Sequence, residues 1–306
     1  MSASGMQLDH EPANPQRRGL RKGVYLVPSF FTAANIGMGF FSVMSCLRGF
    51  QLLGGPSPDL SGAASHFNSA AIAIGFAVLF DMLDGRIARM TKTTTEIGIQ
   101  LDSIADVVTF GLAPAVLAYV WGYGSALTEN VPLHRLALFL SFMYLMCGAF
   151  RLARFNVQAS RPRIMAEGTI KVDKKSFVGL PIPVAGGLIA AIVHFAPPPL
   201  IGYGPERAKV YSGLLMLLVG FLSVMMVSTL RFSSFKTVGT RSRSMRTVIL
   251  ILAVGMLIAL YSEYVLLALV VAYILHGLLS RLFGMFWRRG ESAEAKLESK
   301  SITRET

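Results

Sequence analysis

Residues 80–108 read FDMLDGRIARMTKTTTEIGIQLDSIADVV, and four aspartates in this stretch decide how the chain is interpreted. Asp81 and Asp84 are three residues apart, and Asp102 and Asp106 are four apart. Either spacing places both side chains of a pair on one face of a helix. The flanking sequence is strongly apolar, so these carboxylates occupy positions where membrane helices rarely carry charge.

The composition is typical of a membrane protein. Of the 306 residues, 53% are hydrophobic and 15% are charged, whereas a soluble domain carries about 25% charged residues. A net charge of +12 also suits nucleic-acid binding, but the basic residues flank apolar runs and do not cluster with aromatics on a polar module. Membrane topology and anionic lipid headgroups account for the charge, and we expect no nucleic-acid partner.

The apolar runs predict an all-α polytopic membrane helix bundle of about eight transmembrane helices. Each run has roughly the ~20 residues that cross the hydrocarbon core, and a backbone in lipid must form its hydrogen bonds internally, as helices do. The predicted spans are residues 25–47, 66–88, 98–120, 136–155, 177–196, 210–230, 246–262 and 264–285. A tight turn would join the last two, so seven spans are the alternative. We expect a flexible tail at 1–23, one transmembrane domain at 24–286 and a charged tail at 287–306.

The distribution of basic residues predicts the orientation. Of the 29 lysines and arginines, those on one side of the predicted bundle are Arg48, Arg135, Arg207 and Lys209. All the others flank the opposite helix ends. Because basic loops stay on the inner side of a membrane, we expect a multi-pass protein of the cell (inner) membrane. Both termini and the aspartate-bearing helix ends would then be cytoplasmic.

The carboxylates predict a metal site. The loop between the second and third spans is short, which makes the two helices antiparallel neighbours, so Asp81 and Asp84 would meet Asp102 and Asp106 at one depth. One aspartate at the centre of a membrane helix costs about 2.5–3.5 kcal/mol. Clustered hard oxygen ligands suit Mg²⁺ or Mn²⁺, and also Ca²⁺. Two such cations would balance the four negative charges.

Small and basic residues accompany the aspartates. Gly85, Ala88 and Gly98 would let a ligand or a second backbone approach closely. Arg86 and Arg89 add the positive charge that a phosphate group requires. Ordinary helix packing and basic inner-loop anchors are the alternative interpretations of these residues.

From Asp81 to Asp106 the sequence spells D-x2-D-G-x2-A-R-x8-G-x3-D-x3-D. This pattern resembles, without departure, the signature of the CDP-alcohol phosphotransferases. The resemblance implies a six-helix catalytic core in the membrane, a homodimer and two divalent metals per subunit. It also implies a reaction that displaces CMP from a CDP-linked lipid or alcohol.

Four segments resemble the phosphatidylserine synthase branch of that family: VPSFFTAANIGMGFFSV (27–43), QLDSIADVVTFGLAPA (100–115), FRLARFN (150–156) and FVGLPIPVAGG (177–187). Ser29 stands where that branch usually has asparagine, and PVAGG replaces the more common P-A-A-A. The resemblance implies that CDP-diacylglycerol and L-serine react to give phosphatidylserine and CMP, with membrane lipids as the surroundings.

The resemblance also implies roles for individual residues. Asp81, Asp84 and Asp102 would hold the first metal. Asp81, Asp102 and Asp106 would hold or face the second, with Asp106 as general base for the acceptor hydroxyl. The residues that would line the cytidine and phosphate pocket are Gly85, Ala88, Arg89 and Gly98.

Two more pairs are candidates for substrate contacts. Thr32 and Asn35, at the cytoplasmic end of the first span, would reach the nucleotide, with helix packing as the alternative. Arg151 and Arg154 stand three apart on one face of the fourth span and would bind the carboxylate of serine. A basic inner loop is the alternative interpretation of that pair.

Two alternative functions remain at this stage. A sister enzyme would use glycerol phosphate, inositol phosphate or choline as its acceptor. A cation or proton transporter would place its carboxylates at several depths of the membrane, whereas here they gather at one end of two helices.

Overall fold

The chain folds into a bundle of long helices. The computed structural model describes residues 15–91, 96–124, 126, 131–160, 176–228, 231–233, 262, 264–276 and 279. Its α-helices are α1 (Pro15–Leu53), α2 (Leu60–Thr91), α3 (Glu96–Asp106), α4 (Ala113–Leu117), α5 (Val131–Ser160), α6 (Ile182–Phe195) and α7 (Pro205–Val227). A further apolar helix covers Tyr264–His276. Two three-residue strands, β1 (Ser176–Val178) and β2 (Arg231–Ser233), pair antiparallel. The predicted all-α class is confirmed.

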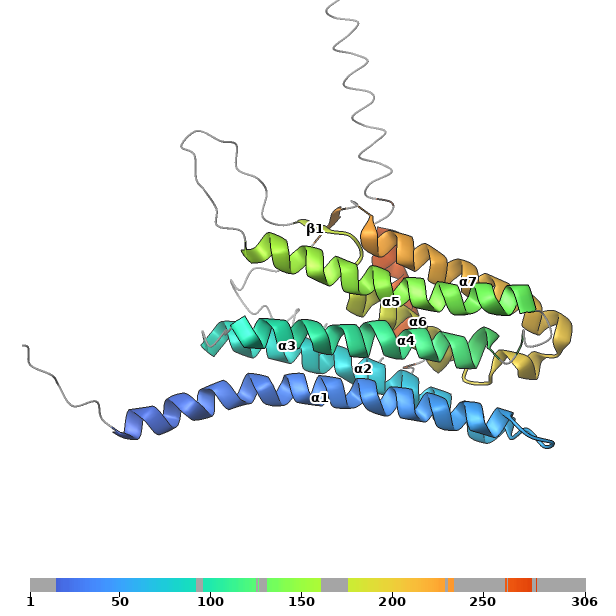
Figure 1. Ribbon diagram of the computed structural model, residues 1–306, viewed down its shortest axis with the longest axis horizontal. Helices are drawn as coiled ribbons and strands as arrows, with labels where there is room; N and C mark the ends of the chain where they lie inside the picture. Colours follow the sequence, from blue (N-terminus) through green and yellow to red (C-terminus); the bar gives the residue numbers. More distant parts are fainter. Residues whose placement is uncertain are drawn as a thin grey trace, which may run out of the picture.

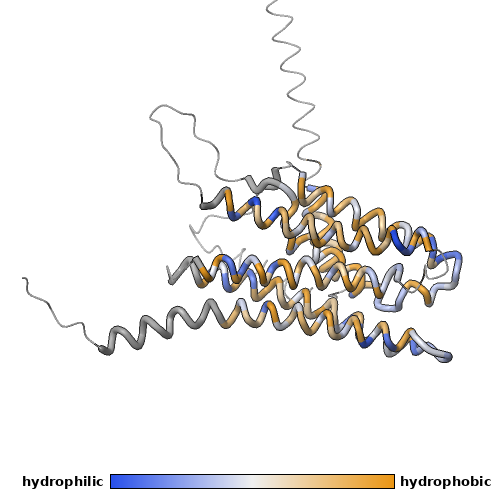
Figure 2. The backbone as a smooth tube through the Cα atoms, viewed as in Figure 1, coloured by the Kyte–Doolittle hydropathy of each residue, from blue (hydrophilic) through white to orange (hydrophobic). Residues whose placement is uncertain are grey.

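The helices lie side by side along one long axis (Figure 1), with α1 and α2 on one side, α5 and α7 on the other, and α3 and α4 between them. Hydrophobic residues cover much of the helix shafts, and hydrophilic residues concentrate toward the helix ends (Figure 2). This arrangement suits a protein whose shafts lie in hydrocarbon and whose ends reach the membrane surfaces.

Four helical segments have the length and apolar composition of membrane spans. They are Phe30–Leu53, Ile97–Tyr123, Val131–Val157 and Pro205–Val227. They match the first, third, fourth and sixth predicted spans. The predicted span 66–88 lies within α2, a helix of 32 residues. The chain is therefore an integral membrane protein.

The structure differs from the prediction at some boundaries. The predicted span 177–196 contains only a 14-residue helix, α6, because β1 and Gly179, with φ of +81°, precede it. Helix α1 begins at Pro15, inside the predicted tail 1–23, where proline at the first helical position precedes good helix formers.

Other predicted boundaries fall outside the described residues. These are the span 246–262 (Ser262 excepted), the part of the span 264–285 beyond His276 (Leu279 excepted), and the tail 287–306. The total of eight spans and the domain boundaries stay predictions.

The third helical rod contains two π-helical turns. Helix α3 continues through η1 (Val107–Leu112), α4 and η2 (Ala118–Tyr123). Pro114 has no N–H, so the carbonyl of Phe110, four residues earlier, lacks its usual helical donor. The hydroxyl of Tyr144 on α5 donates to that carbonyl at 3.1 Å. Helix α5 thus supports the rod about one helical turn beyond its last aspartate, Asp106.

Helix α1 packs against the same turn through a glycine. A Cβ added to Gly39 would lie 2.5 Å from Oγ1 of Thr109 and 2.9 Å from its Cα. The hydroxyl of Thr109 donates to the backbone carbonyl of Asn35 at 3.0 Å. Only glycine permits this approach of the two backbones, which fixes the position of α1 beside the segment that carries Asp106.

We expect Gly39→Ala to separate α1 from η1, since the added Cβ would lie 2.9 Å from the Cα of Thr109, a backbone atom that cannot rotate aside as a side chain can. The free energy of unfolding should fall by about 1–3 kcal/mol. Thermal unfolding in detergent should therefore begin at a lower temperature. Gly37→Ala is the matched control, because a Cβ there would meet nothing within 4 Å. Equal unfolding temperatures for the two variants would contradict this account of the α1–η1 contact.

Candidate active site

Three aspartates from two helices meet at one end of the bundle. Asp81 lies near the end of α2, and Asp102 and Asp106 lie in α3. One carboxylate oxygen from each can be chosen so that all three lie within 4.8 Å of one another. The prediction that neighbouring spans pool their acidic side chains is confirmed for these three residues, which we call the carboxylate cluster.

Asp84 stands beside the carboxylate cluster and has a partner of its own. Its side chain is only 6% exposed and accepts a hydrogen bond from the hydroxyl of Thr32 on α1. Its charge also interacts with those of Asp102 and Asp106. Asp84 therefore belongs to the same acidic site and ties α1 to it, while its predicted role as a metal ligand stays a prediction.

The carboxylate cluster has the properties expected of a site for a divalent cation. Two unit charges about 4 Å apart repel by about 4 kcal/mol at an effective dielectric constant of 20. Asp106 is 9% exposed, and its buried Oδ1 has no hydrogen-bond partner among the described residues. Such an oxygen normally finds a donor or a cation. Three hard oxygen donors at this spacing fit Mg²⁺, Mn²⁺ or Ca²⁺.

Helix α1 supplies a second unsatisfied group. The side chain of Asn35 is 1% exposed, and neither its amide oxygen nor its amide nitrogen is hydrogen-bonded within the part of the chain that the structure describes. Asn35 lies one helical turn beyond Thr32, on the same face of α1. A buried amide with both ends unsatisfied costs free energy, and it suits a residue that receives a polar ligand.

Of the two predicted arginines, Arg151 is the one whose charge is coupled to the acidic site. It is half-buried in α5, and its charge interacts with that of Asp106. Its Nε atom is buried and has no hydrogen-bond partner in the described ranges. Arg154 is also half-buried, but no hydrogen bond or ion pair between described residues links it to the aspartates. The prediction that both arginines act together stays a prediction.

The predicted small and basic pocket residues lie on the helices that carry the aspartates. Gly85 is half-buried in α2, and Gly98 is exposed in α3. Ala88 and Arg89 belong to the helical backbone of α2, but their side chains lie outside the described part of the structure. Their role around a nucleotide stays a prediction.

Sequence reasoning missed one contact that holds the site together. The amide nitrogen of Asn156 on α5 donates to the hydroxyl of Ser103 at 2.8 Å, and that hydroxyl donates to the carbonyl of Ile99 at 3.0 Å. Ser103 directly follows Asp102 in the chain. An asparagine near the end of an apolar helix was the available signal, but its partner is 53 residues away.

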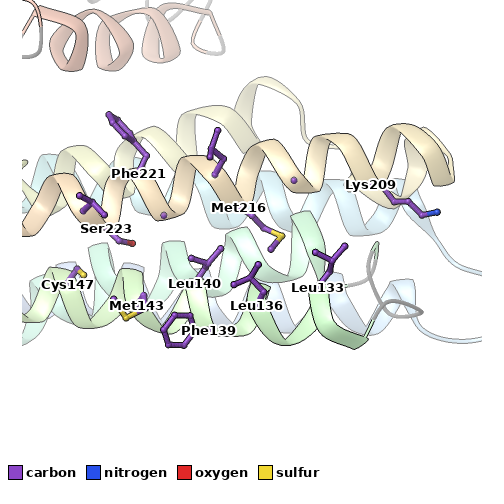
Figure 3. A pocket seen from close by; sticks show the side chains of 14 residues that line it. Leu133, Leu136, Phe139, Leu140, Met143, Cys147, Lys209, Met216, Phe221 and Ser223 are labelled. Atoms are coloured by element: carbon purple, nitrogen blue, oxygen red, sulfur yellow. The ribbon is translucent and has the colours of Figure 1, made fainter.

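A large groove lies elsewhere, between α5 and α7 (Figure 3). It has a volume of about 770 Å³ and an almost wholly apolar lining, with Lys209 at one end and Cys147 at the other. No carboxylate lines it. Its chemistry is that of a surface in contact with lipid, so the polar reaction site is the acidic one.

A site of this kind, at the end of a helical membrane bundle, is characteristic of a known family. The family model described as CDP-alcohol phosphatidyltransferase matches residues 25–225. The chain belongs to this family. The matched range holds six helical rods: α1, α2, the rod from α3 to η2, α5, α6 and α7. The predicted family membership is confirmed, and the chain is an enzyme of this CMP-releasing class.

Several curated relatives share one name, CDP-diacylglycerol–serine O-phosphatidyltransferase. A CDP-diacylglycerol–serine O-phosphatidyltransferase of Helicobacter pylori (strain J99) is 32% identical over 222 residues, 70% of this chain and 75% of the relative. One from Helicobacter pylori (strain 26695) is 30% identical over 269 residues, 86% of this chain and 93% of the relative. One from Saccharomyces cerevisiae is 35% identical over 166 residues, 54% of this chain and 52% of the relative.

The carboxylate cluster generates a prediction about cation binding. Mn²⁺ should raise the unfolding temperature of the purified protein, since a ligand at 100 times its Kd adds about 2.7 kcal/mol. Replacing Asp81, Asp102 or Asp106 by asparagine should remove most of that increase. Asp59→Asn is the control, because Asp59 caps the far end of α2 through the N–H of Gly62 at 2.9 Å. An undiminished Mn²⁺ effect in all three cluster variants would exclude the cluster as the cation site.

Proposed function

We propose that this enzyme transfers the phosphatidyl group from CDP-diacylglycerol to L-serine, which gives phosphatidylserine and CMP. The observation that carries the proposal is the carboxylate cluster of Asp81, Asp102 and Asp106 within a CDP-alcohol phosphatidyltransferase chain. The choice of serine is supported by the names of the Helicobacter and yeast relatives. The segments around 150–156 and 177–187 resemble the serine-using branch.

In the proposed reaction, the hydroxyl oxygen of serine attacks the phosphorus that carries diacylglycerol. A new P–O bond forms there, the P–O bond to CMP breaks, and CMP leaves with the electron pair. The serine proton passes to a carboxylate or to water. The divalent metals, Mg²⁺ or Mn²⁺ and two per subunit, would stabilise the charge on the diphosphate and on the departing CMP.

The acidic residues would have two roles, metal binding and proton transfer. Asp81, Asp84 and Asp102 would hold the first metal, and Asp81, Asp102 and Asp106 would hold or face the second. Asp106 would also orient the serine hydroxyl and accept its proton. The buried Oδ1 of Asp106, which has no partner among the described residues, is the atom that suits this task.

The substrates would be held by groups around the aspartates. The amide of Asn35 would bind the nucleotide, together with Thr32, Gly85, Ala88, Arg89 and Gly98. Arg151, with Arg154 one turn away, would pair with the carboxylate of serine. The site would open to the cytoplasm, where both substrates' polar groups are found, and two copies of the chain would form a homodimer.

CMP release from CDP-diacylglycerol by the purified enzyme tests the acceptor. We expect release that requires Mn²⁺ or Mg²⁺ and L-serine. Glycerol phosphate, inositol phosphate and choline, supplied one at a time, should support at most background release. Release with one of these and not with serine would assign the chain to a sister activity. No release with any acceptor would contradict the proposed reaction and favour transport.

Asp106→Asn should separate catalysis from stability. The variant keeps the shape of the side chain but loses the charge, so CMP release should fall by about 10²–10⁴-fold, as for a lost general base. Without metal its unfolding temperature should equal or exceed that of the wild type, because the variant removes one charge from a cluster of three carboxylates that repel one another. Wild-type turnover in this variant would remove Asp106 from the mechanism.

A further inference from the structure

Helix α3 is joined to α5 by a hydrogen bond whose direction follows from the local geometry. The hydroxyl of Ser103 donates its proton to the carbonyl of Ile99, in its own helix, at 3.0 Å. The amide nitrogen of Asn156 on α5 donates to the oxygen of that hydroxyl at 2.8 Å. Because the proton of Ser103 is used within α3, its partner on α5 has to be a donor, and an asparagine amide supplies one.

The side of α3 that bears Ser103 lies next to the side that bears the aspartates. Each residue of an α-helix turns by about 100°, so Ser103 stands about 60° from Asp106 and about 100° from Asp102 around the axis. A hydrogen bond at this position resists rotation of α3 about its own axis. Such a rotation would carry Asp102 and Asp106 away from Asp81 on α2, and the repulsion within the carboxylate cluster favours it when no cation is bound.

Hydrogen bonds hold the third rod on both sides of Asp106. After Asp106, the hydroxyl of Thr109 donates to a carbonyl of α1, and a carbonyl of the rod accepts from the hydroxyl of Tyr144 on α5. Before Asp106, Ser103 accepts from the amide of Asn156. The part of the rod that carries Asp106 is therefore fixed to neighbouring helices at two levels, and it resists turning as one piece.

We propose that Asn156 is a positioning residue for the cation site: its hydrogen bond to Ser103 fixes the rotation of α3 at which Asp102 and Asp106 face Asp81. Asn156 acts through α3 and contacts neither the cation nor the substrates. It raises the affinity for the divalent cation, because ligands that are already held together lose less free energy on binding than ligands that must be ordered. The inference rests on the proposed cation at the carboxylate cluster, but not on the identity of the acceptor.

The test measures the Kd for Mn²⁺ in the full-length protein in detergent, without substrates, from the loss of the free-ion electron paramagnetic resonance signal. Asn156→Ala and Ser103→Ala should each raise this Kd about 2- to 10-fold, the effect of one lost hydrogen bond. The double variant should raise it by less than the two single effects combined, because both substitutions remove the same bond.

Ser141→Ala is the matched control. Ser141 also lies on α5 and is hydrogen-bonded to the third rod, through the hydroxyl of Tyr123 at 2.6 Å, but at the end away from the aspartates. This variant should lower the unfolding temperature, because it leaves a buried hydroxyl without its partner. Its Kd for Mn²⁺ should stay within twofold of the wild-type value.

A Kd unchanged in Asn156→Ala overturns the positioning role, even if the unfolding temperature falls. An equal rise of the Kd in Ser141→Ala also overturns it, since any lost bond between α5 and the rod would then weaken the site. If Asn156→Ala does not fold, Ser103→Ala decides, because it removes a single oxygen atom. A wild type that binds no Mn²⁺ overturns both this inference and the proposed cation site. Because no acceptor is present, the result does not depend on whether serine is the substrate.

Discussion

Mutual repulsion of like charges is the constraint on which the rest of this structure depends. Asp81, Asp102 and Asp106 bring their oxygens within 4.8 Å of one another at the end of an apolar bundle. Such an arrangement is unfavourable unless cations balance it and the surrounding helices prevent the side chains from moving apart. The contacts between the helices must therefore contribute more free energy than the repulsion between the aspartates costs.

The contacts that do so come from two helices, α1 and α5, and lie within about two turns of the aspartates. Thr32 on α1 donates to Asp84, and Gly39 lets α1 approach Thr109 closely. From α5, Asn156 binds Ser103, which follows Asp102. Tyr144 binds the carbonyl that Pro114 leaves without its helical donor. The hydrogen bonds among these contacts join polar groups of different helices, and a hydrogen bond in a low-dielectric surrounding is stronger than one in water.

The sequence alone predicted the features that depend on local spacing. The pairs Asp81–Asp84 and Asp102–Asp106, the short connection between them and the apolar runs were sufficient to predict a helical membrane bundle with pooled carboxylates. Contacts between residues far apart in the sequence could not be predicted from local spacing. Thr32 and Asp84 are 52 residues apart, and Asn156 and Ser103 are 53 apart. Hydropathy also failed to place the start of α6, since Gly179, Leu180 and Pro181 are compatible with an apolar run although the chain is not helical there.

The π-helical turn η1 makes the length of the third rod as important as its composition. An α-helix turns by about 100° for each residue, and a π-helical turn holds one residue more than the α-helical turn it replaces. Deleting one residue from Val107–Leu112 would rotate Asp102 and Asp106 by about a quarter turn relative to everything beyond Ala113. Insertions and deletions within this segment should therefore be eliminated by selection as the family diverges.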